Sequence, residues 1–250
     1  MRPRLGAIRA AALAVLLAAG PAAALEPLGE RGLAVVNGGG GEFFVTPVPI
    51  TWQIAHASDS GRVVHMAWLP AGQETGSWSD KVSLQLFPGE TGTTGKQLLD
   101  RIVRRYAQDC RNLLGTETDV KQARGRTVAF RLLGCTEHAR TGRGELALFR
   151  VVQGAESLYL MQRAWRTPTF DRAHLPFSRD ILGKTRLWLQ GGRVCRAGSS
   201  DADHACPPRL APAIRNTSLE QPVRVIELGG TGAPGGGDGE GAGARDRPGS

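Results

Sequence analysis

Short polar turns between apolar segments constrain the fold of this chain more than any other feature. Residues 58–61 (SDSG) join two such segments, and residues 153–156 (QGAE) join another two. Connections of this length link neighbouring antiparallel strands as hairpins. Strand-like segments of this kind lie at residues 51–57, 62–69, 81–87, 126–135, 145–152 and 157–165. We therefore expect an antiparallel sheet of about six strands.

Two helices are expected from apolar side chains spaced three and four residues apart. The first covers about five turns from Leu98 to Leu114 and ends at Gly115, and the second covers residues 177–190. The element order is three strands, a helix, three strands and a helix. This order predicts an α+β domain in which both helices pack on one face of the sheet. Residues 29–49, which precede the first strand, are expected to be a loose lead-in.

The segment GETGTTGKQ at residues 89–97 lies between a strand and a helix, as a nucleotide-binding P-loop does. A Walker motif needs four residues between its glycines and a Ser or Thr after its Lys, where the hydroxyl binds magnesium. The glycine spacing differs here, and Gln97 follows Lys96. Thr94 and Gln97 instead predict a capping box at the start of the helix. No cofactor is expected.

The two ends of the chain differ in composition from the rest. In residues 1–24, arginines precede an apolar segment and three small residues, which predicts a cleavable secretory signal with Leu25 as the first mature residue. Residues 229–250 are rich in glycine and predict a flexible tail. The intervening residues 25–228 suffice for a single α+β domain with its own core. No segment after the signal predicts a transmembrane helix.

The four cysteines are Cys110, Cys135, Cys195 and Cys206. An even number in an exported chain favours disulfides over free thiols. Cys110 is on the apolar side of the first helix and Cys135 ends a strand, whereas Cys195 and Cys206 flank a polar loop. These positions predict the pairs 110–135 and 195–206. Export and disulfides together predict a periplasmic or secreted protein.

The loop between the last two cysteines also contains Asp201, Asp203 and His204. Cysteine, histidine and aspartate can bind zinc, but the closely spaced cysteine pairs of most zinc sites are missing. We therefore expect a disulfide loop here and no metal site.

The net charge of the sequence is +8, and its basic and acidic residues are interspersed. This charge permits attraction to an anionic surface or an acidic envelope protein, but it is not typical of a nucleic-acid-binding protein. Arginines lie on the helix face opposite the apolar one, and Trp78 lies in a polar loop. The candidate binding residues are Trp78, Arg101, Arg104, Arg105 and Arg111, with Arg163 and Arg166 on a strand. The alternatives are a solvated helix surface and a tryptophan that folds back onto the sheet.

No catalytic residue can be assigned, because the chain has no His-Glu-x-x-His motif and no Gly-x-Ser-x-Gly motif. His56 and His65 lie on neighbouring strands, but the intervening turn does not place them clearly on one face. A deep pocket with either histidine beside a carboxylate or a serine would favour a periplasmic hydrolase. A third hypothesis, a periplasmic metal or redox protein, predicts free thiols.

Two segments, ETGSWSDKVSLQLF and SLYLMQRAWR, resemble a family of small exported proteobacterial proteins of uncharacterised function. This resemblance covers residues 50–195 and implies an envelope location without implying an activity. The order of strands and helices is also similar to that of PsbP/Mog1-like proteins, a fold of binding and assembly proteins. The leading hypothesis is accordingly an exported, non-catalytic binding or assembly protein of the bacterial cell envelope.

Overall fold

The computed structural model describes residues 31–218, 221 and 223–227. The expected signal, residues 1–24, and the expected tail, residues 229–250, lie outside the described residues. The described part contains two antiparallel sheets, of four and eight strands, and three α-helices, which confirms the α+β class. None of its helices is long and apolar enough to cross a membrane.

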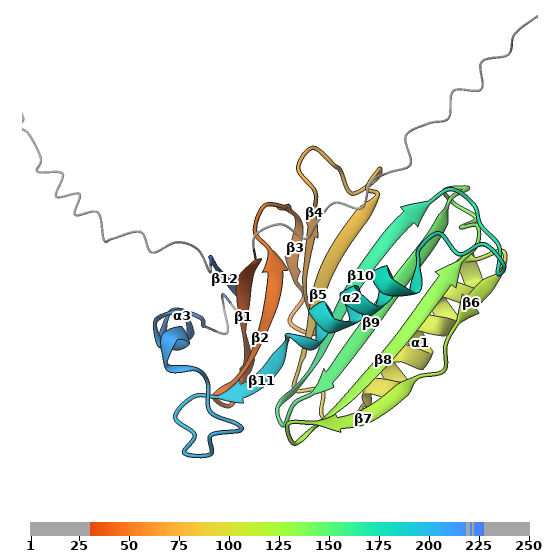
Figure 1. Ribbon diagram of the computed structural model, residues 1–250. Coiled ribbons are helices and arrows are strands. Elements are labelled where there is room, and N and C mark those ends of the chain that lie inside the picture. Colours follow the sequence, from red (N-terminus) through yellow and green to blue (C-terminus); the bar gives the residue numbers. More distant parts are fainter. Residues whose placement is uncertain (1–30, 219–220, 222, 228–250) are drawn as a thin grey trace, which may run out of the picture.

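The larger sheet contains all six strands that the sequence predicted, together with two short ones (Figure 1). Its strands, in spatial order, are β3 (Gln53–Asp59), β4 (Val64–Leu69), β5 (Asp80–Pro88), β10 (Ser157–Thr167), β9 (Gly144–Gln153), β8 (Arg126–Cys135) and β6 (Leu113–Gly115), and β7 (Asp119–Ala123) also pairs with β8. The two predicted hairpins, β3–β4 and β9–β10, are present.

The smaller sheet was not predicted, so the estimate of about six strands was too low. Its strands, in spatial order, are β11 (Arg193–Arg196), β2 (Glu42–Pro49), β1 (Arg31–Gly39) and β12 (Val223–Glu227). Residues 29–49 were expected to be a loose lead-in because they contain prolines and a run of glycines. The glycines form the β1–β2 turn, where Gly39, Gly40 and Gly41 adopt positive φ angles that favour glycine. Every residue of β2 is buried, so the strand lacks the polar alternation that marks a half-exposed strand.

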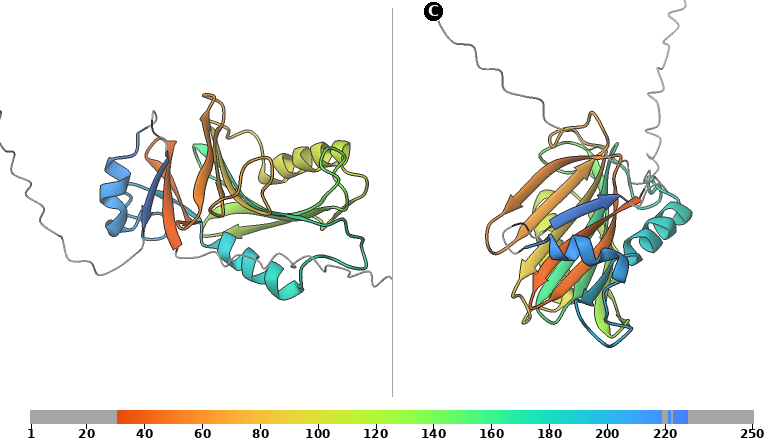
Figure 2. Two further views of the ribbon diagram at one scale, coloured as in Figure 1. Left: turned by 90° about the horizontal axis from the view of Figure 1, so that it is seen from above. Right: turned by 90° about the vertical axis from the view of Figure 1, so that its left-hand side faces the viewer.

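The two long helices lie on opposite faces of the larger sheet, contrary to our expectation of one face (Figure 2). α1 (Gly95–Asp109) contacts β8 and β9, and α2 (Arg179–Gln190) contacts β9, β10 and β2. Successive side chains of a strand point to opposite faces. Both sets are apolar here: Leu99 of α1 packs with Phe149 of β9, whereas Trp188 of α2 packs with the cluster that includes Leu148. Both faces of the sheet are therefore apolar, and other elements must shield each of them from water.

α1 ends one turn earlier than its apolar periodicity predicted. Its N-terminus has the expected capping box, in which the Gln97 amide donates to Thr94 Oγ1 and the Thr94 amide donates to Gln97 Oε1. At the other end Cys110 is already extended, and residues 113–115 form β6 beside the end of β8. The Cys110–Cys135 disulfide joins these segments. Leu113 and Leu114 therefore lie in a strand, because pairing with β8 replaces the last helical turn.

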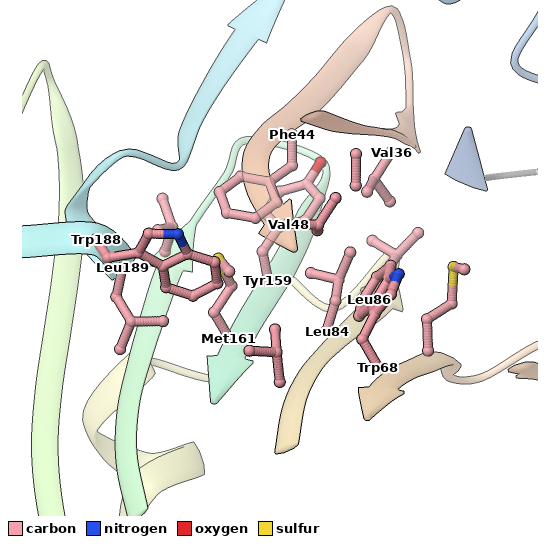
Figure 3. Close-up of a cluster of buried hydrophobic side chains, with 14 of the residues drawn as sticks. Val36, Phe44, Val48, Trp68, Leu84, Leu86, Tyr159, Met161, Trp188 and Leu189 are labelled. Carbon is pink, nitrogen blue, oxygen red and sulfur yellow. The ribbon is translucent and has the colours of Figure 1, made fainter. Parts of the chain in front are cut away.

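The main core lies between the smaller sheet, the larger sheet and α2 (Figure 3). Phe44 of β2 stacks on Tyr159 of β10, with ring centroids 4.8 Å apart. Trp188 of α2 lies in the same cluster. The other side of the smaller sheet packs against α3 (Ala211–Arg215) and a 3₁₀ helix (Pro208–Leu210) through a separate apolar cluster.

Both predicted disulfides are present, and no described cysteine is free. Cys110–Cys135 closes a loop of 25 residues, and Cys195–Cys206 closes one of 11. On the chain-entropy estimate, the first loop stabilises the fold by roughly 3 kcal/mol. Disulfides of this kind are typical of an oxidising compartment outside the cytoplasm.

A buried carboxylate connects the two sheets. Glu42, at the start of β2, has no exposed surface. It accepts hydrogen bonds from the Tyr159 hydroxyl (3.0 Å) and the Ala155 amide (2.7 Å), and Arg126 Nη2 lies 3.6 Å from its Oε2. These partners belong to β10, to the β9–β10 turn and to β8. A charge in this position is tolerable only because each of these groups compensates it.

We expect Glu42→Ala to lower the free energy of unfolding by about 3 kcal/mol, since the change leaves buried donors and an arginine without their acceptor. Urea unfolding followed by tryptophan fluorescence measures this. Glu74→Ala, in an exposed loop, is the control and should change stability little. Equal effects of the two substitutions would show that Glu42 does not connect the sheets.

Candidate functional site

A pocket of about 470 Å³ lies on the α1 side of the larger sheet, where the end of α1 meets two loops. The β4–β5 loop, the β8–β9 loop and strands β5, β9 and β10 complete its walls. Its lining residues are Thr75, Trp78, Lys81, Arg105, Tyr106, Asp109, His138, Arg140, Thr141, Glu145 and Arg166. The lining thus carries four lysine or arginine side chains and two carboxylates.

Trp78 forms one wall of this pocket and folds back onto the sheet. The residue is only 4% exposed and packs in the apolar cluster beneath α1. Lys81 Nζ and Arg166 Cζ each lie 4.3 Å from the centroid of its ring. Arg166 Nη1 also donates to the Gly76 carbonyl at 2.7 Å, which holds the loop against the strand. Two cations therefore lie over one indole, an arrangement that cation–π attraction stabilises.

A polar chain crosses the sheet beside the pocket. The Ser83 hydroxyl donates to Gln162 (3.1 Å), Gln162 donates to the Tyr106 hydroxyl (3.2 Å), and Tyr106 donates to Glu145 Oε1 (2.6 Å). Burial, and then the charge of Glu145, raise the pKa of Tyr106 well above its ordinary value. The phenol therefore stays protonated and acts as a donor. Glu145 is held in place and keeps acceptor capacity toward the pocket.

The Lys81 ammonium is a partly desolvated charge in the pocket. Burial lowers the pKa of Lys81, Glu145 opposes this change, and Arg166 adds to it. Within the part of the chain that the structure describes, no carboxylate lies within ion-pair distance of Lys81. A partly desolvated cation of this kind attracts an anionic ligand.

The Cys110–Cys135 disulfide positions the opposite wall. It joins the end of α1 to the end of β8, from which the loop with His138 and Arg140 continues. The Ala139 amide donates to the Asp109 carbonyl (2.7 Å), and Arg140 Nη2 lies 3.3 Å from the Asp109 carboxylate. The loop is therefore attached to α1 by a covalent bond, a hydrogen bond and an ion pair.

The structure brings together only some of the predicted binding residues. Trp78 and Arg105 line the pocket, as does Arg166. Arg101 and Arg104 line a separate depression of about 350 Å³ near the start of α1. Arg111, whose side chain is 74% exposed, pairs with Glu137 at 3.0 Å.

Arg163 lies on the opposite face of the sheet from Arg166, where its Nη2 contacts a buried Asp80 carboxylate at 2.6 Å. Lys81, Arg140 and Glu145 were missed by the sequence reasoning. Strand alternation could have placed Lys81 on the α1 face, but its neighbour Arg166 becomes known only from the pairing of β5 with β10.

His56 and His65 lie together, with ring centroids 4.8 Å apart, since a β-bulge at Ile54–His56 shifts the register of the β3–β4 hairpin. His56 Nε2 is 3.0 Å from the Ser58 hydroxyl, in an exposed setting. Neither histidine lines the pocket described above. No ion pair between His56 and a carboxylate occurs among the described residues, so the third group of a hydrolytic triad is not in place there. A periplasmic hydrolase therefore stays a hypothesis.

The loop with Asp201, Asp203 and His204 is closed by its disulfide, as expected, and His204 Nδ1 lies 2.7 Å from Asp201. Over the described ranges, no group of three or more His, Cys, Asp and Glu side chains could hold a metal ion.

His65 should make stability depend on pH. Burial, then His56 and Lys81, lower the pKa of His65 to about 4. The folded protein therefore binds fewer protons than the unfolded chain between about pH 6.5 and about pH 4, and its free energy of unfolding falls as the pH falls through this range. We expect His65→Gln to lessen this fall, as measured by urea unfolding at about pH 7 and about pH 5. The exposed His174→Gln is the control, and an unchanged pH dependence in His65→Gln would contradict the assignment.

Comparison with known proteins identifies similar folds at low sequence identity. The Ran-binding protein Mog1p of Saccharomyces cerevisiae aligns with a TM-score of 0.38 and 9% identity, over 79% of this chain and 97% of Mog1p. Cyanobacterial PsbP (CyanoP) from Synechocystis sp. PCC 6803 aligns with a TM-score of 0.39 and 12% identity, over 70% of this chain and 99% of CyanoP. The predicted likeness to the PsbP and Mog1 proteins is thus found. It concerns the fold alone.

No family model matches the chain, and no curated protein matches it. The predicted resemblance to exported proteobacterial proteins is not found by these comparisons and stays a prediction.

Proposed function

We propose that this protein is an exported, non-catalytic binding or assembly protein of the bacterial cell envelope, and that its pocket holds an acidic segment of a partner protein. The observation that supports this most directly is the position of Lys81 and Arg166 over Trp78. The buried indole holds the two cations in place, and the cations supply charge for a carboxylate. Arg105 and Arg140 add positive charge at the rim.

An acidic peptide suits this pocket better than a uniformly anionic surface does. The lining includes Glu145 and Asp109, which would repel a continuous layer of phosphates. A peptide instead has both carboxylates and N–H donors, and the carboxylates of the pocket can accept bonds from those donors.

Export is the other half of the proposal. It is supported by the composition of residues 1–24 and by the two disulfides.

To test binding, fluorescence anisotropy would follow a fluorescein-labelled oligoglutamate peptide titrated with the purified protein. We expect Lys81→Gln and Arg166→Gln each to weaken binding about tenfold, because each removes a charge-assisted contact. Added salt should also weaken binding. Arg172→Gln, at an exposed position outside the pocket lining, is the matched control. The pocket assignment would be refuted if Lys81→Gln and Arg166→Gln bound the peptide as tightly as Arg172→Gln does. It would also be refuted if the wild-type protein bound an oligoglutamine peptide as tightly as the oligoglutamate peptide.

To test export, the protein would be isolated from fractionated cells and its N-terminus sequenced. We expect a first residue of Leu25 in the envelope or secreted fraction, and no thiol that reacts with an alkylating agent before reduction. Cytosolic protein that begins at Met1 and has four reactive thiols would contradict this half of the proposal.

A further inference from the structure

The β3–β4 hairpin, at one edge of the larger sheet, holds two histidines side by side (Figure 1). The ring centroids of His56 and His65 are 4.8 Å apart, and the two ring planes are inclined by 52°. His56 is exposed, as is nearly all of β3, whereas His65 on β4 is half-buried. One imidazole is therefore open to solvent, while its neighbour is held in place by the sheet.

A β-bulge in β3 brings the two rings to the same face of the sheet. If the register at Ile54 continued unbroken, His56 would lie opposite Met66, which points into the main core. The register instead shifts between Ile54 and His56, so that His56 lies opposite Ala67. Because His65 and Ala67 are two residues apart on β4, they point to the same face. The bulge thus directs His56 toward His65, and bulges at sheet edges often redirect a side chain in this way.

The ring of His65 has no hydrogen-bonding partner within the described part of the chain. It makes no side-chain hydrogen bond and no ion pair there, and its recorded ring contact is the one with His56. His56 Nε2 lies 3.0 Å from the hydroxyl of Ser58, which is itself opposite His65 in the hairpin. Half-buried imidazole nitrogens normally have a partner. The lone pair of His65 is therefore available to a ligand.

Two imidazoles in this arrangement suit a metal ion. Two ligand nitrogens that each lie about 2 Å from one metal ion are about 3 Å apart, and rings with centroids 4.8 Å apart can reach that separation by small side-chain rotations. A hydrogen bond from His56 Nε2 to the Ser58 hydroxyl would orient the ring and leave Nδ1 for the metal. The lowered pKa of His65 also leaves its ring neutral at pH 7, which is the form that binds metals.

A structural role explains less of this pair. Two histidines that contact each other repel when both are protonated, and no carboxylate lies within ion-pair distance of either ring among the described residues. The exposed His56 buries little apolar surface in return. A metal ion shared by the two rings would instead use a lone pair of each.

We propose that His56 and His65 bind one divalent transition-metal ion that prefers imidazole ligands, and that Cu²⁺ binds most tightly. Imidazole nitrogens suit copper, nickel and zinc, and the affinity of such a site is highest for Cu²⁺. Two protein ligands leave positions on the ion for water or for a group of a partner molecule. Neither histidine lines the pocket proposed for the acidic peptide, so this site does not depend on the proposed function.

Isothermal titration with CuCl₂ at about pH 7, after treatment of the purified protein with EDTA and dialysis, tests the site. We expect one Cu²⁺ per chain, bound about tenfold or more weakly by His56→Gln and by His65→Gln. Electron paramagnetic resonance of the copper complex should show two nitrogen ligands in the wild type and one in either variant. His56 is exposed, so His56→Gln should keep the wild-type thermal unfolding midpoint. His174→Gln, at an exposed histidine beside Asp171, is the matched control and should bind copper as the wild type does.

Absence of copper binding would overturn this proposal and leave the peptide proposal intact. Copper binding that His56→Gln leaves unchanged, or that His174→Gln weakens equally, would also overturn it. So would a wild-type spectrum with a single nitrogen ligand, or binding of Mg²⁺ as tight as that of Cu²⁺. Lys81→Gln removes a positive charge that acts on His65, so it should bind copper at least as tightly as the wild type while it weakens peptide binding. That contrast separates the two sites.

Discussion

The apolar character of both faces of strands β8, β9 and β10 is the constraint on which the rest of the structure depends. A strand sends alternate side chains to opposite faces, and both sets are apolar in these three strands. One face would remain exposed to water if both helices packed on the other. α1 therefore covers one face, while α2 and the smaller sheet cover the second.

The pocket lies where the last turn of α1 meets the β4–β5 and β8–β9 loops. α1 packs mainly on β8 and β9, whereas Lys81 comes from β5 and Arg166 from β10. Trp78 of the β4–β5 loop packs onto the sheet and forms one wall of the pocket. The Lys81 and Arg166 side chains lie against its ring. The Cys110–Cys135 disulfide attaches the loop on the far side to the end of α1. The same bond that stabilises the fold thus shapes the candidate binding site.

Charges in this protein fall into two groups with different physical roles. Glu42 and the pair Arg163–Asp80 are buried and compensated by neighbours, so they contribute to the specificity of the packing. Lys81 in the pocket has no carboxylate within ion-pair distance among the described residues. A cation of this second kind attracts an anionic ligand, which is why the peptide-binding proposal rests on Lys81.

The sequence by itself determined the local features: six strands, two helices, the capping box of Thr94 and the pairing of the cysteines. Each of these depends on residues close together in the chain or on the alternation of polar and apolar side chains. The tertiary structure alone decided that the helices lie on opposite faces, that residues 29–49 contribute a second sheet and that Trp78 lies beneath Lys81 and Arg166. These features depend on strands that pair across long stretches of chain, and a fully buried strand such as β2 shows no alternation from which its partner could be inferred.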